Sequence, residues 1–383
     1  MKNHLDRFTV GLTLSIACWS ADVASAGDLE LDKLTCKAGK PFVVQSGPGA
    51  SMLEYRGAGG HFIVAQVPGA GLRVQLLDNK RGTVKATKLV NAPSARAPSI
   101  GSGGDLLWLD GKTDSAPDEL WTVTLDVTKG KLEEQAAPRK IYTFAADERP
   151  ADGQAWLLVD LGMSTPRVVW VDTKGNLRMV QPSTDKEGKQ SQSFVLGQWG
   201  ATSSRPLMNG MQDEATIAWL AHGKDGTSDL MVISVRLDFG KPPKFAPAVK
   251  VATVATPADR QAPPGSKSEF IVQEGSDVLY GHLAKLKRDE KLMQTGEKLT
   301  LPAGTPPTSW AIHGGALVMA NDQGLWFGWQ GSAAAPFRVI AGTKGKQVSD
   351  VNVIATAPQA VFVIWHESDA KTEATRAVHI SCK

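Results

Sequence analysis

One strand–loop–strand unit recurs along this chain and constrains its fold more than any other feature. In the clearest copy, residues 105–126, a polar loop separates the apolar stretch Leu-Leu-Trp-Leu from the alternating stretch Leu-Trp-Thr-Val-Thr-Leu. Seven copies, 44 to 61 residues apart, begin at Phe62, Leu106, Trp156, Ile217, Phe270, Leu317 and Val361. Each segment between copies can supply two more strands. Four antiparallel strands repeated around an axis form a β-propeller.

The strand repeat therefore predicts an all-β protein, and more specifically a seven-bladed β-propeller. The 38 glycines and 22 prolines are spread along the chain, as expected for many short strands joined by turns. Helical periodicity is hard to find beyond the N-terminal segment. A six- or eight-bladed propeller, or two stacked β domains, are the alternatives. Because no linker rich in Pro and Ser separates two halves, residues 27–383 are expected to form a single β-propeller domain.

Residues 1–26 have the features of a signal peptide. A positively charged start precedes a mostly apolar stretch, 8–18, and Ala-Ser-Ala at 24–26 matches a cleavage site. The apolar stretch is too short to span a bilayer, so no membrane insertion is expected. The sequence predicts export to the bacterial periplasm or secretion, with lipidation of Cys18 as the alternative. The net charge of +3 gives no reason to expect nucleic-acid binding.

The two ends of the exported chain are predicted to complete one blade together. The last copy of the repeat has room for three strands before Lys383, and the stretch 33–47 can supply the fourth. Closure by this N-terminal strand would remove the exposed sheet edges. It would also bring Cys36 beside Cys382, and an even pair of cysteines in an oxidising compartment predicts a disulfide. Two buried free thiols are the alternative.

Arginines recur just before or at the start of the predicted innermost strands. They are Arg96, Arg149, Arg205 and Arg260. In a propeller the loops that enter these strands open on one face, at the mouth of the central channel. A ring of guanidinium groups there could bind an anionic group bidentately. The alternative is that each arginine pairs with a carboxylate of its own or the neighbouring blade. The partners considered are Asp147, Glu148, Asp213 and Asp259.

Polar residues also recur at the ends of the predicted second strands, facing the same mouth. They are Gln66, Asp110, Asp160, His222, Glu274, Asn321, His366 and Glu367. Asp110 and Asp160 are the candidates for ligand binding among them, and the alternative is that turns simply favour polar residues. Tryptophans in the strands are expected to pack between blades, with sugar stacking as the alternative for any that are exposed.

The stretch Ala95 to Asp126 resembles the sialidase-like propellers with Asp-box (BNR) repeats. The likeness lies in Ala-Arg-Ala-Pro-Ser-Ile, followed by Gly-Asp-Leu-Leu-Trp-Leu-Asp-Gly and Asp-Glu-Leu-Trp-Thr-Val-Thr-Leu-Asp. It implies arginines that converge on a substrate carboxylate, with a tyrosine nucleophile paired with a glutamate and an aspartate as acid/base. The chain has three tyrosines, and Tyr280, six residues from Glu274, lies within a predicted strand. Sialidases also usually have six blades, whereas seven are predicted here.

The sequence contains no nucleotide-binding, serine-hydrolase or zinc-protease motif, and no Cys-x-x-Cys pair. No metal, no cofactor and no catalytic residue is assigned. The preferred function is an exported, non-catalytic propeller that binds a protein partner or an acidic glycan at the mouth of the channel. The alternative is a sialidase-like glycoside hydrolase that acts on acidic sugars.

Overall fold

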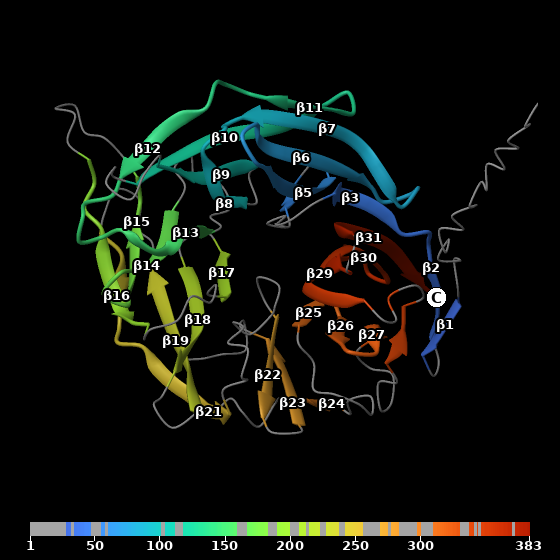
Figure 1. The fold of residues 1–383 in the computed structure, drawn as a ribbon. Helices are drawn as coiled ribbons and strands as arrows, with labels where there is room; N and C mark the ends of the chain where they lie inside the picture. The colour runs from blue at the N-terminus through green and yellow to red at the C-terminus, as the bar shows by residue number, and fades with distance from the viewer. Residues whose placement is uncertain are drawn as a thin grey trace, which may run out of the picture.

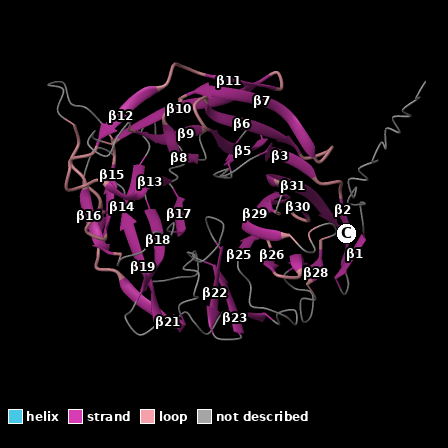
Figure 2. Cartoon of the chain, in the orientation of Figure 1, coloured by secondary structure: helices cyan, strands magenta, loops and turns pink. Residues whose placement is uncertain are grey.

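The protein is described from a computed structural model. The described residues are 28–31, 34–46, 55–57, 60–100, 104–111, 118–158, 167–182, 190–199, 207–211, 214–222, 227–236, 242–255, 269–274, 277–282, 297–299, 309–329, 337–340, 343, 346–369 and 372–383. Within these ranges all regular structure is β-strand and none is helix (Figure 2). The predicted signal peptide and Cys18 lie outside them. None of the described segments forms a helix that could cross a lipid bilayer.

The described strands form seven antiparallel sheets set around a common centre, the arrangement of a β-propeller (Figure 1). The first two sheets consist of consecutive strands. One contains β4 (Tyr55–Gly57), β5 (Gly60–Val67), β6 (Gly71–Asp78) and β7 (Thr83–Asn91). The next contains β8 (Ala95–Ile100), β9 (Asp105–Asp110), β10 (Glu119–Thr128), β11 (Lys131–Glu134) and β12 (Arg139–Thr143), of which both β11 and β12 pair with β10.

Three further sheets follow in chain order. The third contains β13 (Pro150–Leu158), β14 (Arg167–Asp172), β15 (Asn176–Val180) and β16 (Phe194–Gln198). The fourth contains β17 (Leu207–Met211), β18 (Glu214–His222), β19 (Thr227–Arg236), β20 (Lys244–Phe245) and β21 (Val249–Ala255). The fifth contains β22 (Glu269–Glu274), β23 (Asp277–His282) and β24 (Glu297–Leu299).

The sixth sheet is again consecutive, whereas the last combines both ends of the chain. The sixth contains β25 (Ser309–His313), β26 (Ala316–Asn321), β27 (Gly324–Trp329) and β28 (Arg338–Val339). The last contains β29 (Gln347–Ala357), β30 (Ala360–Ser368) and β31 (Glu373–Cys382), joined by β1 (Asp28–Leu31), β2 (Leu34–Ala38) and β3 (Phe42–Ser46). Both β2 and β3 pair with β31, so the expected contribution of the N-terminal stretch is confirmed.

The predicted disulfide is present. Cys36 of β2 lies directly opposite Cys382 of β31, and the two sulfur atoms are bonded across 346 residues of sequence. Both cysteines are buried, and Phe42 of β3 packs edge-on against Phe362 of β30. The last sheet is therefore held by backbone pairing, by apolar contact and by a covalent bond.

The apolar core lies between neighbouring sheets. One buried cluster joins Phe62 and Val74 of the first sheet to Leu106 and Trp108 of the second. Another joins the third and fourth sheets, where the indoles of Trp199 and Trp219 stack with ring centres 5.8 Å apart. The prediction that tryptophans pack between blades is confirmed for the buried indoles of Trp108, Trp170, Trp219 and Trp365. The side chain of Trp156 lies outside the described residues.

The third sheet corrects one strand assignment made from the sequence. The strand around Trp156 was expected to be second in its blade, but β13 stands first and pairs with β14. The reason is the turn after Asp172, where Gly175 has a φ of 78° and the carboxylate of Asp172 accepts backbone N–H groups. This turn makes β14 and β15 a hairpin. Period-2 alternation does not distinguish an inner strand from the one beside it.

Candidate functional site

Charged residues from several sheets lie on one face of the propeller. In three sheets the innermost strand begins where the second strand ends, as the pairings Ala95 with Asp110 and Pro150 with Asp172 show. Gln347 pairs with Ser368 in the same way. We call this side the BC face, because the turns between the second and third strands lie on it. Arg96, Arg149 and the described residues of the second row lie on this face.

Arg96 and Arg149 converge on one carboxylate, that of Asp118. Arg96 donates from Nη2 to Oδ1 of Asp118, and Arg149 donates from Nε to Oδ2 at 3.3 Å. The Asp118 side chain is 5% exposed, whereas those of Arg96 and Arg149 are 38% and 26% exposed. The carboxylate thus lies beneath two arginine side chains that remain partly exposed. Arg205 and Arg260 lie outside the described residues.

Local sequence explains how Arg96 reaches this position. The register between β8 and β9 shifts between Arg96 and Ser99, and Ala97 within this bulge has a φ of 46°. Pro98 has no N–H group for the ladder, which suits a break in pairing. A bulge re-aims the neighbouring side chain. A Cβ atom at Gly111 would lie 3.0 Å from both Nη2 of Arg96 and Oδ1 of Asp118, so this glycine leaves room for the ion pair.

The two aspartates proposed as ligand-binding residues have different outcomes. Asp110 ends β9 opposite Ala95 and is half-buried, at the edge of the Arg96 site. The carboxylate that joins the two arginines, however, is that of Asp118, which sequence reasoning missed. Asp160 lies outside the described residues. The position of Asp118 in the polar loop before β10 was the available signal, but loop polarity alone did not single it out.

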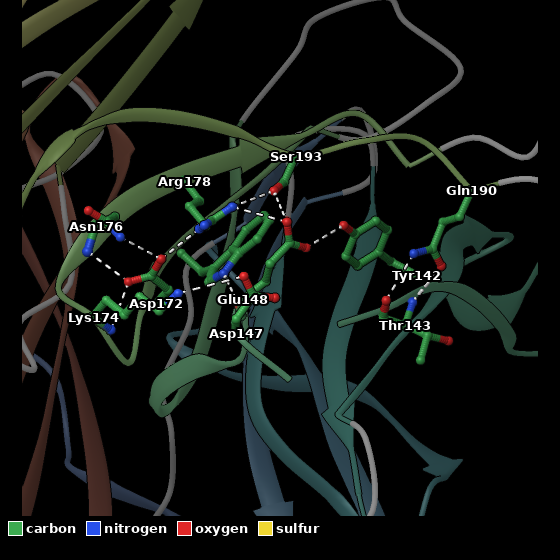
Figure 3. A network of polar contacts seen from close by, with 11 residues as sticks. Tyr142, Thr143, Asp147, Glu148, Asp172, Lys174, Asn176, Arg178, Gln190 and Ser193 are labelled. Carbon is green, nitrogen blue, oxygen red and sulfur yellow. Dashed lines mark hydrogen bonds and ion pairs between the residues drawn. The ribbon is translucent and has the colours of Figure 1, made fainter. Parts of the chain in front are cut away.

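A second ionic network adjoins the first through Glu148, the neighbour of Arg149 (Figure 3). Arg178 of β15 lies between two carboxylates: its Nε donates to Asp172 at 2.6 Å and its Nη1 donates to Glu148 at 3.0 Å. Ser193 bridges Arg178 and Glu148 with hydrogen bonds of 2.8 and 2.7 Å. Sequence reasoning listed Glu148 as a partner for arginine but missed Arg178. Asp147, also listed, pairs with Lys174.

Asp172 is the most enclosed carboxylate of this network. Its Oδ1 accepts the backbone N–H groups of Lys174 and Asn176, and its Oδ2 accepts from the side chains of Asn176 and Arg178. Burial opposes ionisation, but the hydrogen bonds from Asn176 and Arg178 outweigh it and lower the pKa of Asp172. The charge therefore holds the turn and the arginine in place.

The network contains a tyrosine–glutamate pair that sequence reasoning also missed. The hydroxyl of Tyr142 donates to Oε2 of Glu148 at 3.1 Å. Tyr142 is only 2% exposed, and Phe144 and Trp170 pack against its ring. Burial, followed by the charge of Glu148 and the hydrogen bond to it, raises the pKa of Tyr142 above its ordinary value. Such a hydroxyl is poorly suited to act as a nucleophile.

Glu367, at the end of β30, is the centre of a third charged group on this face. Its Oε1 accepts from Nζ of Lys346 at 2.7 Å and from Nε of Arg376, and its Oε2 accepts from Nε1 of Trp365 at 2.9 Å. Burial opposes ionisation, but the donors Lys346, Trp365 and Arg376 lower the pKa of Glu367. Nearby, Nε2 of His366 lies 2.9 Å from Oε1 of Glu373.

Other residues of the second row serve turns and indoles. Oδ1 of Asn321 accepts from the backbone of Gln323 and from Nε1 of Trp326, both at 2.9 Å. The side chains of His222 and Glu274 lie outside the described residues. In the part of the chain that the structure describes, no three His, Cys, Asp or Glu side chains are grouped as a metal site would need.

Comparison with known proteins does not identify a function for this site. No family model matches the sequence, and no curated protein matches it. The similar solved structures include the Dos1 propeller, with 9% identity over 90% of this chain and 95% of that chain and a TM-score of 0.46. Apo AztD from Citrobacter koseri is 10% identical over 84% of this chain and 96% of that one, with a TM-score of 0.40. The SapL1 lectin, in complex with alpha methyl fucoside, is 13% identical over 86% and 97%, with a TM-score of 0.37. At these scores the likenesses assign no function.

Proposed function

We propose that the protein is an exported, seven-bladed β-propeller, closed by its N-terminal strand, that binds an anionic, carboxylate-bearing ligand on its BC face without transforming it. The observation that carries the proposal is the pair Arg96 and Arg149. They come from two neighbouring sheets and share one buried carboxylate, that of Asp118, while both arginine side chains remain partly exposed. The seven sheets and the Cys36–Cys382 bond support the closed ring.

Charge and geometry both favour an anion above Arg96 and Arg149. Within the trio of Arg96, Asp118 and Arg149, the two guanidinium groups outnumber the one carboxylate. The two groups have about ten N–H donors between them, whereas a single carboxylate accepts about four hydrogen bonds. Asp118 therefore fixes the orientation of the arginines through one hydrogen bond to each. A second carboxylate, supplied by the ligand, suits the fork of donors on the solvent side.

Export is supported by two independent features. The predicted signal peptide occupies residues 1–26. The disulfide between Cys36 and Cys382 is of the kind that persists in oxidising compartments such as the bacterial periplasm.

The alternative, a sialidase-like hydrolase, has weaker support. A sialidase-like mechanism would need a tyrosine that can attack the substrate beside a glutamate. Tyr142 does contact Glu148, but its hydroxyl is buried and Glu148 is held by Arg178 and Ser193. Binding without chemistry fits the accessible arginines better than a reaction at this enclosed pair.

Calorimetric titration with polygalacturonate, against an uncharged glucan, tests the proposed function. We expect the acidic polymer to bind and the glucan not to bind. Arg96→Gln or Arg149→Gln should each weaken binding about 10-fold, since a charge-assisted hydrogen bond is lost at a partly desolvated site. The matched control is Arg139→Gln, which removes the same charge from the exposed outer strand β12. Failure of the polymer to bind, equal loss in the control, or turnover of a fluorogenic sialoside would overturn the proposal.

A further inference from the structure

The charged group around Glu367 repeats the construction of the Arg96 site. We define the Asp118 cluster as Arg96, Asp118 and Arg149, and the Glu367 cluster as Lys346, Glu367 and Arg376. In each, one carboxylate accepts hydrogen bonds from two cations. The side chain of Glu367 is 6% exposed, and those of Lys346 and Arg376 are 29% and 33% exposed. Each cluster places a buried negative charge under two accessible positive charges.

One cation of each cluster occupies an equivalent place in its sheet. Lys346 immediately precedes the innermost strand β29, as Arg149 immediately precedes β13. Glu367 lies at the end of the second strand β30, opposite Val348. Both clusters therefore lie on the BC face, and in the ring the sheet β4–β7 lies between the second sheet, which holds Arg96, and the last sheet (Figure 1).

Exposed apolar side chains are distributed quite differently. Among the described residues, the large apolar side chains that are exposed all lie on the outermost strands of their sheets. They are Val43, Leu89, Val195, Phe245, Val249 and Val339. Folded protein partners are usually anchored by buried aromatic and aliphatic side chains. The BC face near the two clusters offers charge and polar turns instead.

We propose that the Glu367 cluster is a second anion-binding subsite, and that the ligand is an extended acidic glycan whose carboxylates reach both clusters. The inference rests on the proposed function of the Asp118 cluster and names the class of its ligand. Each cluster carries one net positive charge and is screened by water and salt, so either one alone is a weak site. A chain with repeated carboxylates gains affinity by occupying both, because the second contact is made at a high effective concentration.

The polar surroundings favour a glycan over a folded acidic protein. The turn that follows Asp172 presents Lys174 and Asn176 on the same face, and the turn that follows Asn321 presents Gln323. Such groups can pair with sugar hydroxyls between the charged contacts. Because the large exposed apolar side chains among the described residues lie on the outermost strands, a polar polymer with repeated carboxylates fits the clusters better than a folded protein.

The test compares a trigalacturonate with a long polygalacturonate by calorimetry, using the intact disulfide-bonded protein. In the wild type we expect the long polymer to bind at least about 10-fold more tightly per molecule than the trimer, beyond its statistical number of sites. Lys346→Gln combined with Arg376→Gln should remove most of this advantage and leave the affinity for the trimer within about 2-fold. Lys250→Gln, on the outer strand β21, is the matched control for a lost exposed lysine.

Two further variants keep the test decisive if the double variant fails to fold. Lys346→Gln alone leaves Arg376 on Glu367, and Arg376→Lys keeps the positive charge while removing the fork; each should lower polymer affinity about 3-fold. A polymer advantage unchanged in these variants, with binding still lost in Arg96→Gln, would overturn the second subsite but leave the proposed function intact. No binding of either ligand by the wild type would defeat the proposed function itself. Equal or tighter binding of poly-glutamate of matched length would overturn the glycan assignment.

Discussion

The third sheet, β13–β16, and the last sheet, β29–β31 with β2 and β3, are held in place in different ways. In the last sheet the outer strands come from the other end of the chain and are fixed by the Cys36–Cys382 bond. In the third sheet the strands are consecutive, and side-chain contacts tie the sheet to its neighbour. Arg178 binds Glu148, and the side chain of Gln190 pairs with the backbone of Thr143.

The comparison separates ion pairs with an enclosed cation from ion pairs with partly exposed cations. Arg178 is largely buried and lies between two carboxylates, so its charge is fully matched. Arg96, Arg149, Lys346 and Arg376 are more exposed, and each pair of them shares one carboxylate. Ion pairs are expected to stabilise the fold where carboxylates equal or outnumber cations, as around Arg178. They are expected to bind a ligand where cations outnumber carboxylates, as in the Asp118 and Glu367 clusters.

The largest effect is expected from removing the covalent closure of the last sheet. Cys36→Ser combined with Cys382→Ser should lower the free energy of unfolding by about 4 kcal/mol, because the bond closes a very long loop and restricts the unfolded chain. Urea unfolding followed by tryptophan fluorescence measures this change. The wild type treated with an alkylating agent but no reductant is the control. A loss below about 1 kcal/mol would mean that pairing of β2 with β31 closes the sheet without help from the bond.

A smaller but still large effect is expected from breaking the network of the third sheet. Arg178→Gln leaves the buried Asp172 and the half-buried Glu148 without their shared cation, and should lower the free energy of unfolding by about 3 kcal/mol. Tyr142→Phe, which removes one hydrogen bond to Glu148, should lower it by about 1 kcal/mol. Urea unfolding at neutral pH compares the two. Equal losses in the free energy of unfolding would contradict the expectation that Arg178 contributes more to the network than Tyr142.

The stabilisation that Asp172 provides should decrease at low pH. The pKa of Asp172 is lowered in the folded protein, so its pairing contributes stability above its ordinary pKa of 3.8. This contribution is lost as the pH falls through the folded pKa. The free energies of unfolding of the wild type and Arg178→Gln should therefore become more similar below about pH 4. Repeating the unfolding curves in acidic buffers measures this change.

The smallest effect concerns His379 in the last sheet. Its ring packs on Phe362, and its Nε2 is buried with no hydrogen-bond partner among the described residues. Burial lowers its pKa below the ordinary value of 6.5, so the unfolded chain takes up a proton first as the pH falls. Stability should fall as the pH drops below about 6.5, by at most about 1.4 kcal/mol per pH unit.

Thermal melting between pH 7.5 and 5.5 detects this dependence. His379→Gln should show a shallower decline than the wild type, and His366→Gln, on the BC face, is the matched control. Parallel curves for the wild type and His379→Gln would show that another group titrates in this range. A loss of stability between pH 7.5 and 5.5 that depends on His379 would distinguish the last sheet from the third sheet. The ionic network of the third sheet is expected to weaken only below about pH 4.

Sequence predicted the elements of the site better than their pairing. Arg96 and Arg149 were singled out because they recur before innermost strands, and both lie on the BC face. Their shared partner is 22 and 31 residues away, respectively, in a loop whose approach depends on how two sheets pack. Arg178 was missed for the same reason, since its contact with Glu148, in the turn before β13, spans 30 residues. Asp110, next to the correct place, ends a strand as predicted but is not the carboxylate that binds the arginines.

The sequence by itself determined the all-β architecture and the recurring hairpins, and it predicted the strand supplied by the N-terminus and the pairing of Cys36 with Cys382. Alternation and turn residues act over a few positions, and the two cysteines that follow the predicted signal peptide allow one intramolecular pairing. Tertiary structure alone decided that β13 is innermost, that Asp118 and Glu367 each lie beneath two cations, and that Tyr142 is enclosed. These features depend on register and on packing between sheets, where the energy of a contact is set by residues far apart in the chain.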